Sequence, residues 1–376
     1  MGWFTARVPL PIPDLTDGTV RLRAYQETDL GRLVEEGNDP TTLAWMNIGP
    51  ATEETARAYL ASARAGWEAE QVHPRWAICT VDNDAYLGSI VLNPHAWVAG
   101  QCPAATVAYS LHPEGRGRGL MTRALRLAAR EFFTSYGGQR LHWAAFRGNL
   151  KSWKVAWACG FSWHATIPQA TLWNGELRDD WVASLGRDDD VATPKTPSLN
   201  FPEITTGELR LRAWRPDDVE SLEPPDHPEH FLPHRAIPPL DGFESWRLTR
   251  IEHLMLGEGL SWCIAEAATD RALGYVTIFS RSGPISDFAE LGYYLAPSAR
   301  GRGIAATAAS HAVEHAFRPC SDGGLGIRRL VATTTADNHG SNHTLRRVGF
   351  TEFGREREVD LIDSGPVDLI HWELLG

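Results

Sequence analysis

The sequence has few of the features that mark secreted, membrane-spanning or disulfide-linked chains. Its five cysteines are scattered and form no Cys-x-x-Cys pair, which is typical of a protein in a reducing compartment. No apolar run approaches the roughly 18 residues of a transmembrane helix. The first residues lack the apolar core of a secretion signal. We therefore expect a cytoplasmic location and no membrane partner.

Positive charge is also scarce. Lysine occurs at only three positions, and 36 basic residues stand against 47 acidic ones, for a net charge of −11. Nucleic acids and anionic membranes attract basic surfaces, so this balance argues against either partner. The Gly-Lys-Ser/Thr signature of a P-loop is absent. At 376 residues, with 43% apolar residues, the chain is long enough for two or three domains with full cores.

A short glycine-arginine motif occurs twice. Each copy follows an apolar run that ends in proline and precedes apolar residues at helical spacing, which predicts a strand, a turn and a helix. The N–H groups of such a turn converge at the positive end of a helix dipole and favour phosphate. Glycine lets a bulky anion reach the backbone. The predicted phosphate-binding residues are Arg116, Gly117, Arg118, Gly119 and Leu120 in the first copy and Arg300, Gly301, Arg302, Gly303 and Ile304 in the second.

The motif belongs to a long internal repeat. Asn149 and Ser152 correspond to Asn338 and Ser341, 189 positions later, and other pairs keep nearly the same spacing along both halves. Strand patterns mix with helical ones in each half. We therefore predict an α+β fold with two tandem domains, each a mixed, largely antiparallel sheet flanked by helices. The predicted boundaries are 1–188 for the first domain, 189–206 for a linker and 207–376 for the second domain.

These motifs resemble the GNAT superfamily of acetyl-CoA-dependent N-acetyltransferases, in particular the branch of the ribosomal-protein N-terminal acetyltransferases. The resemblance covers both halves and rests on the glycine turn, the Asn-x-x-Ser pattern and the Gly-Phe pair that follows it. It departs from the family at Glu114 and Ser298, where glutamine or arginine is usual. The resemblance implies acetyl-CoA as co-substrate, no metal, and direct attack of a primary amine on the thioester. The amine would belong to a small molecule or to a peptide or protein N-terminus.

The resemblance also implies roles for residues beyond the turn. A strand N–H near Leu111 or Leu295 would bind the thioester oxygen. Asn149 and Asn338 would contact the pantetheine arm of coenzyme A or fix the turn before the next helix. Ser152 and Ser341 would donate a proton to the leaving thiolate; alternatively, their hydroxyls are N-caps of that helix. Tyr293 and Tyr294 are alternative acids, although aromatic residues in a sheet more often serve packing.

Glu290 is the candidate base that would take the proton of the amine. It begins the strand before the second turn, where the family often has a carboxylate; alternatively, it is a glutamate that faces water. The first half has Thr106 at this position, so we expect unequal halves, with the second one catalytic. His112, His142 or a chain of waters could substitute in the first half.

Four questions stay open from the sequence. The pattern from His311 to His315 matches the His-x-x-Glu-His of some zinc proteases, but its helix has its apolar face assigned to the core. Eleven of the fifteen tryptophans precede the linker, either as core or as the wall of an acceptor pocket. The rivals to an N-terminal acetyltransferase are an antibiotic- or metabolite-modifying acetyltransferase and a non-catalytic acyl-CoA-binding sensor or scaffold. A monomer and a homodimer are both compatible with the sequence.

Overall fold

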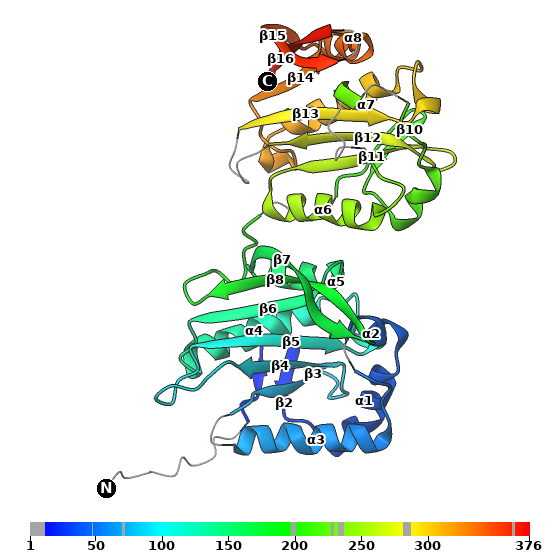
Figure 1. Ribbon diagram of the computed structural model, residues 1–376. Helices are drawn as coiled ribbons and strands as arrows, with labels where there is room; N and C mark the ends of the chain where they lie inside the picture. The colour runs from blue at the N-terminus through cyan, green and yellow to red at the C-terminus, as the bar shows by residue number, and fades with distance from the viewer. Residues whose placement is uncertain are drawn as a thin grey trace. The chain divides into compact units, whose positions relative to one another are not determined.

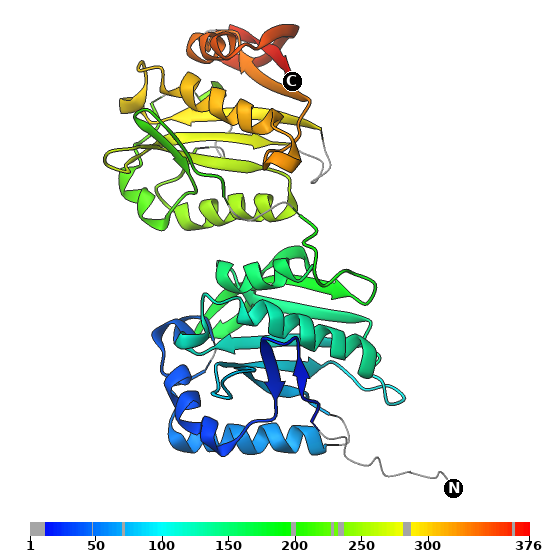
Figure 2. The same cartoon turned by 180° about the vertical axis from the view of Figure 1, so that it is seen from behind.

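The computed structural model describes residues 12–46, 48–69, 72–196, 201–226, 229–231, 237–280, 287–362 and 365–376. The chain divides into two compact units, Met1–Lys195 and Thr196–Gly376 (Figures 1 and 2). The first residues of the chain, on which the signal prediction depends, lie outside the described part. In the described residues no helix is both long and apolar enough to cross a membrane.

The first unit is built around one eight-stranded sheet. The strand order is β1-β2-β3-β4-β5-β6-β8-β7, and every neighbouring pair is antiparallel except β5 and β6, which are parallel. The strands are β1 (Leu15–Thr16), β2 (Val20–Arg23), β3 (Arg75–Thr80), β4 (Gly88–Pro94), β5 (Ala104–Leu111), β6 (Arg140–Phe146), β7 (Ser162–Trp173) and β8 (Glu176–Gly186). The helices are α1 (Leu30–Gly37), α2 (Pro40–Trp45), α3 (Glu53–Glu68), α4 (Leu120–Ser135) and α5 (Leu150–Ala158).

The second unit repeats this topology. Its order is β9-β10-β11-β12-β13-β14-β16-β15, and the one parallel pair is β13 with β14. The strands are β9 (Ile204–Thr206), β10 (Leu209–Arg212), β11 (Leu260–Glu266), β12 (Ala272–Phe279), β13 (Phe288–Leu295), β14 (Arg329–Thr335), β15 (Thr351–Ile362) and β16 (Gly365–Leu375). The described α-helices are α6 (Phe243–Leu256), α7 (Ile304–Phe317) and α8 (His339–Val348). The predicted α+β fold and the tandem arrangement are thus confirmed.

Helices cover both faces of the second sheet, which explains why residues 260–265 of β11 are all buried. Along β11, Trp262 and Ile264 pack in the cluster that contains the buried face of α7. The intervening Cys263 and Ala265 pack with Phe243 of α6. Side chains alternate between the faces of a strand, so α6 and α7 lie on opposite faces of the sheet.

A buried arginine anchors the strand that opens each repeat. Arg23 ends β2 and forms two hydrogen bonds of 2.8 Å with the Asp29 carboxylate. Arg212 ends β10 and binds Asp218 in the same way, at 2.8 and 2.7 Å. Both pairs are nearly inaccessible to solvent. The paired arrangement matches a bidentate guanidinium to a carboxylate and fixes the loop after the strand.

The segment expected to be a linker contributes to both units. Val191 accepts a hydrogen bond from Arg126 of α4, and Lys195 forms an ion pair of 2.7 Å with Asp189. At the other end, β9 joins the second sheet by pairing with β10. Residues 197–200 lie outside the described part of the chain.

Five of the described tryptophans in the first half are core residues, among them Trp143, Trp153 and Trp181. Trp143, Trp153 and Trp181 are at most 2% exposed. Trp143 and Trp153 lie against each other, with ring centroids 5.5 Å apart. These three side chains fill the interior of the first unit, which is the plainer of the two alternatives that the sequence left open.

Candidate functional site

Two parallel strands separate in the second unit and leave a cavity between them. The pairing of β13 with β14 ends at Glu290 and Val331, although β13 continues to Leu295. The cavity has a volume of about 690 Å³, and its walls include Leu291–Leu295 on one strand and Ala332–Thr334 on the other. We call this opening the second fork and its closed end, at Leu291, the vertex.

Backbone N–H groups of β13 point into the second fork. Ala296 donates its N–H to Leu273, on the side of β12, at 2.8 Å. Successive N–H groups of a strand point to opposite edges, so the N–H groups of Leu295 and Tyr293 point into the fork, whereas that of Leu291 is used by the last pair of the parallel ladder, Glu290 with Val331. Leu295 is next to the glycine turn, whereas Leu291 lies at the vertex, about 13 Å further along the strand.

The second glycine turn forms the wide end of this fork. Gly301 and Gly303 have φ angles of 74° and 75°, which few other residues adopt without strain. No side chain caps α7, and its first residues, from Ile304 to Ala306, line the cavity. A helix end of this kind has unsatisfied N–H groups and a positive partial charge. The turn therefore has the geometry of an anion seat.

The first arginine of each turn braces the turn instead of projecting from it. Arg300 donates from Nε to the Leu295 carbonyl at 3.1 Å and forms an ion pair with Asp226. Arg116 donates in the same way to Leu111 at 3.0 Å and pairs with Asp39 at 2.7 Å. The Arg116 hydrogen bond lowers the pKa of Asp39 below its usual value. These arginines therefore hold the backbone of their turns.

The second arginines of the turns are less constrained. Arg302 is 3.9 Å from Glu266. Arg118 donates a long hydrogen bond of 3.4 Å to the Glu114 carbonyl. Both side chains are exposed beside their turns, where they could meet an anion from solvent. The departure from the family pattern at Glu114 has a local partner, because this carboxylate pairs with Arg32 at 2.8 Å.

Arg347 is a further cation at the second turn that the sequence did not reveal. It belongs to α8 and lines the cavity. A Cβ built on Gly303 would lie 3.7 Å from its guanidinium, so the side chain reaches the turn. Arg347 makes no ion pair with the described residues. Only its position near the glycine turn distinguishes it from the other arginines, and this position cannot be read from the sequence without the fold.

The Asn-x-x-Ser pattern places a hydroxyl in the second fork. The Asn338 side chain caps α8 by accepting a hydrogen bond of 3.1 Å from the Ser341 N–H, and Asn149 caps α5 through Ser152 in the same way. The asparagines are therefore the N-caps, and the alternative that the serine hydroxyls are N-caps is wrong. Each serine stands three residues inside the helix. Its hydroxyl is free to serve another purpose.

The hydroxyl of Ser341 meets the phenol of Tyr293. Their oxygens are 2.8 Å apart, and both residues line the cavity. Burial raises the pKa of Tyr293 to about 12, although the hydrogen bond with Ser341 acts in the opposite direction. The phenol thus keeps its proton at neutral pH. The pair can donate a proton into the second fork.

Glu290 lies next to the vertex but on the other face of the sheet. Ala289 and Leu291 pack on the α7 side, so Glu290, Gly292 and Tyr294 point to the α6 side by strand alternation. The Glu290 carboxylate does not line the cavity and forms no hydrogen bond or ion pair with side chains or backbone of the described residues. Tyr294 packs with the aromatic cluster under α6. Of the two tyrosines considered as acids, Tyr293 is the one that meets Ser341.

The first unit has a corresponding tyrosine and serine, but their hydroxyls have different hydrogen-bond partners. The phenol of Tyr109 donates to the Ser152 carbonyl at 2.9 Å. Both hydroxyls, however, accept hydrogen bonds from the indole N–H of Trp143, at 2.9 Å for Tyr109 and 3.1 Å for Ser152. His112 donates its N–H to Leu87, so the N–H of Leu111 points toward β6, as in the second unit.

The histidines proposed as bases in the first unit are engaged elsewhere. His112 is buried, lies 3.0 Å from a Glu35 oxygen, and accepts a hydrogen bond from the Glu114 N–H. His142 stacks on His95, with ring centroids 5.1 Å apart, and burial lowers its pKa. His95 is hydrogen-bonded to Thr106 at 2.8 Å. His142 is thus beside the position that corresponds to Glu290.

The two histidines of the His-x-x-Glu-His pattern have structural partners. His311 is 2.9 Å from the Thr206 hydroxyl. His315 is buried against Trp262. No group of three metal-binding side chains comes together in the described part of the chain.

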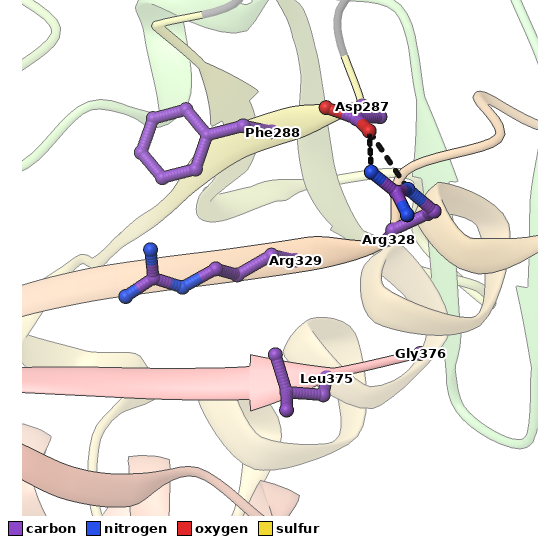
Figure 3. Close-up of a pocket in the computed structure, with 6 residues that line it drawn as sticks. All are labelled: Asp287, Phe288, Arg328, Arg329, Leu375 and Gly376. Carbon is purple, nitrogen blue, oxygen red and sulfur yellow. Dashed lines mark hydrogen bonds and ion pairs between the residues drawn. The ribbon is translucent and has the colours of Figure 1, made fainter.

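A second cavity, of about 550 Å³, lies at the opposite end of β13 and β14 (Figure 3). Its charged groups are already paired. Arg328 binds the Asp287 carboxylate, and Arg329 points away from this pair and binds Glu373 at 3.0 Å. The cavity holds no acid, base or nucleophile that is unengaged, so it is a weaker candidate than the second fork.

Known proteins agree with this architecture. The model of the acetyltransferase (GNAT) domain matches residues 19–162 and 208–351, which together make up more than half of the chain. No curated protein matches the sequence.

Solved structures resemble one unit at a time. An acetyltransferase of the GNAT family from Bacillus anthracis is 14% identical, and the match covers 47% of this chain and 99% of that one, with a TM-score of 0.41. A putative ribosomal-protein-serine acetyltransferase from Vibrio cholerae is 18% identical, with coverages of 47% and 98% and a TM-score of 0.41. RimJ from Mycobacterium smegmatis, solved with a CoA-disulfide, is 16% identical, with coverages of 47% and 88% and a TM-score of 0.40. On the two family matches and the repeated topology, the chain belongs to the GNAT acetyltransferases and has one such domain in each half.

Proposed function

We propose that the protein transfers the acetyl group of acetyl-CoA to a primary amine, and that the reaction takes place in the second fork. The observation that carries the proposal is the cavity itself. In it an uncapped helix end, an edge of unpaired strand N–H groups and a protonated hydroxyl pair face the same space. These groups suit a ligand with a diphosphate at one end and a thioester at the other.

The cavity residues fit the parts of acetyl-CoA in order. The diphosphate would lie at the N–H groups that follow Gly301 and Gly303, with Arg347 as an added cation. The pantetheine arm would run along the free edge of β13, past Leu295. The thioester oxygen would then lie near the N–H of Tyr293, the unpaired strand N–H nearest the vertex, rather than near Leu295 as the sequence suggested. An N–H aimed at developing negative charge stabilises the transition state.

Two proton transfers complete the proposed reaction. The amine nitrogen attacks the thioester carbon, the carbon–sulfur bond breaks, and the sulfur leaves as a thiolate. Ser341, backed by Tyr293, supplies a proton to the thiolate. Glu290, directly or through water, takes the proton that the nitrogen loses. The acceptor would therefore approach from the α6 face, on which Glu290 lies.

The net charge of −11 favours a cationic amine as acceptor, since long-range attraction raises the rate of encounter. Peptides with free N-termini, amine-bearing metabolites and aminoglycosides are the three classes to compare. Each acceptor is incubated with acetyl-CoA and the full chain, and the released thiol is measured. A protein that binds acetyl-CoA but acetylates none of the three classes would instead support the non-catalytic sensor.

The matched test compares the same substitution in the two turns. Gly301→Val places a branched side chain on the proposed phosphate seat, where no protein atom lies within 4 Å. We expect it to reduce activity at least 100-fold, whereas Gly117→Val, which is equally free of protein contacts, leaves activity within about twofold. Glu290→Gln should lower kcat by about 100-fold without weakening coenzyme A binding. Full activity of Gly301→Val would exclude the second fork as the site.

A further inference from the structure

At the fork, a tryptophan and an alanine pair across two neighbouring strands, and their order is reversed between the two units. In the first unit Trp143 on β6 is directly opposite Ala183 on β8. In the second unit the corresponding pair is Ala332 on β14 and Trp372 on β16. Residues that are directly opposite each other share one face of the sheet, so the indole has moved from one strand to its neighbour.

This exchange decides which fork has room. Ala332 is part of the wall of the second cavity. Trp372 is not part of this wall, and its indole N–H donates to Thr334 at 2.8 Å. In the first unit an indole replaces the methyl group of Ala332. It is 2% exposed, packs on Trp153, and donates to the hydroxyls of both Tyr109 and Ser152. The proton-donating pair of the first unit is therefore covered by an indole.

The corresponding opening between β5 and β6 in the first unit, the first fork, is also shorter. The parallel pairing of β5 with β6 continues to Val107 and Trp143, whereas that of β13 with β14 stops one position earlier, at Glu290 and Val331. Val107 corresponds to Leu291, at the vertex of the second fork. In the first unit this residue is itself part of the parallel ladder, so the opening begins one residue closer to the glycine turn.

The first unit also lacks the cation that Arg347 provides beside the second turn. The residue of the first unit that corresponds to Arg347 is Ala158. Gly117 and Gly119 keep the conformation of an anion seat, with φ angles of 71° and 70°. A phosphate group could reach this turn, but the arm that connects a diphosphate to a thioester would have no path past Trp143.

We propose that Trp143 closes the first unit to coenzyme A, so that the chain binds one coenzyme A and not two. The inference builds on the proposed function of the second fork. It makes Trp143 the residue that separates a binding unit from a non-binding unit, and it makes the exchange with Ala183 the compensation that keeps the first core filled.

Titration calorimetry of the full chain with coenzyme A tests this proposal. We expect one site in the wild type and none in Gly301→Val. Adding Trp143→Ala to Gly301→Val should create one new site, which Gly117→Val then removes. If Trp143→Ala impairs folding, Trp143→Ala with Ala183→Trp restores the packing found in the second unit and replaces it in the experiment.

The outcomes separate this inference from the proposed function. Two sites in the wild type, or a site in Gly301→Val that Gly117→Val removes, would overturn the closure of the first unit. A folded Trp143→Ala variant that gains no site would overturn the assignment of Trp143 as the obstruction. A wild type that binds no coenzyme A would instead refute the proposed function, and the gain of a site through Trp143→Ala would still decide the inference.

Discussion

At the scale of single residues, the hydroxyl pair of Tyr293 and Ser341 carries the proposed acid chemistry. Neither hydroxyl alone is a strong acid, but the 2.8 Å contact allows a proton to pass from the phenol to the serine as the serine gives up its own. Asn338 fixes the serine by capping α8. The pair therefore depends on the correct start of a helix as much as on its own chemistry.

The pH dependence of the reaction should reflect this pair. Burial raises the pKa of Tyr293 to about 12, so the phenol stays protonated at higher pH than an ordinary tyrosine. We expect kcat at saturating amine to show no loss between pH 8 and 10. Tyr293→Phe and Ser341→Ala should each lower kcat by about 100-fold with little effect on KM for acetyl-CoA. A falling limb centred between pH 8 and 10 in the wild type would contradict the assignment of Tyr293.

Arg347 should contribute to cofactor binding and not to chemistry. A charge-assisted hydrogen bond is worth roughly 1.5–3 kcal/mol, so Arg347→Ala should raise the Kd for coenzyme A by about 10- to 100-fold. The control is Arg346→Ala. Arg346 is adjacent in α8, but its guanidinium lies over the Trp372 ring, 5.0 Å from the centroid. Equal effects of the two substitutions, measured by calorimetry, would show that α8 contributes charge only in a general way.

At the scale of elements, the loop after each opening strand depends on one buried ion pair. Arg212 is 1% exposed and also donates hydrogen bonds to the carboxylate and the carbonyl of Asp270, at 2.9 and 2.8 Å. Asp218 is almost as buried. Removing one partner leaves the other charged and without its neighbour in a place that water does not reach.

Arg212→Ala should therefore destabilise the second unit by about 3–5 kcal/mol. Arg210→Ala, on the same strand, is the control. Its ion pair with Asp270 is partly exposed and longer, at 3.6 Å, so the loss should be below about 1 kcal/mol. Urea denaturation of the full chain, followed by tryptophan fluorescence, measures both. A loss below about 1 kcal/mol for Arg212→Ala would mean that the loop is held by other contacts.

The contact between α2 and the first glycine turn should depend on pH. Asp39 caps α2 through the Thr42 N–H and binds Arg116. The Arg116 hydrogen bond lowers the pKa of Asp39 from 3.8, so its contribution to stability is complete above pH 3.8 and is lost as the pH falls through the lowered value. We expect Asp39→Asn to lower the melting temperature at pH 7, with the difference shrinking at pH values below 3.8.

The matched control for this pH effect is Glu53→Gln, which removes an exposed pair with Arg57 and should change the melting temperature little at any pH. Calorimetric scans between pH 3 and pH 7 provide the measurement. A difference for Asp39→Asn that stays constant over this range would show that the ionisation of Asp39 does not contribute to stability.

At the scale of the whole molecule, the internal repeat made the fold predictable. A repeated order of strand and helix patterns defined two equivalent sheets, and the asparagine and glycine pairs located the helix that follows each fork. The sequence could not show that Arg116 and Arg300 fold back onto their own turns, because this depends on carbonyls brought near by the turn. Arg347 also became visible only once α8 was placed beside Gly303.

The sequence showed a difference between the units at one residue, and the structure adds several more. The comparison of Glu290 with Thr106 suggested that the halves differ in catalysis, and it required only the alignment of the two repeats. The contrast of Trp143 with Ala332 is present in the same alignment of the halves, but its meaning needs the strand register. Without that register, nothing distinguishes Trp143 from the other ten tryptophans of the first half.

The exchange of indole and methyl between neighbouring strands also constrains how such a chain can evolve. Each single step between the two arrangements passes through a core with two indoles or with none, and both are unfavourable: overpacking costs typically 1–3 kcal/mol, and loss of a buried tryptophan costs about 3–5 kcal/mol. Trp143→Ala and Ala183→Trp should therefore be strongly epistatic, each harmful alone and mild together. The same barrier separates the two arrangements in both directions, so neither unit acquires the packing of the other through single neutral substitutions.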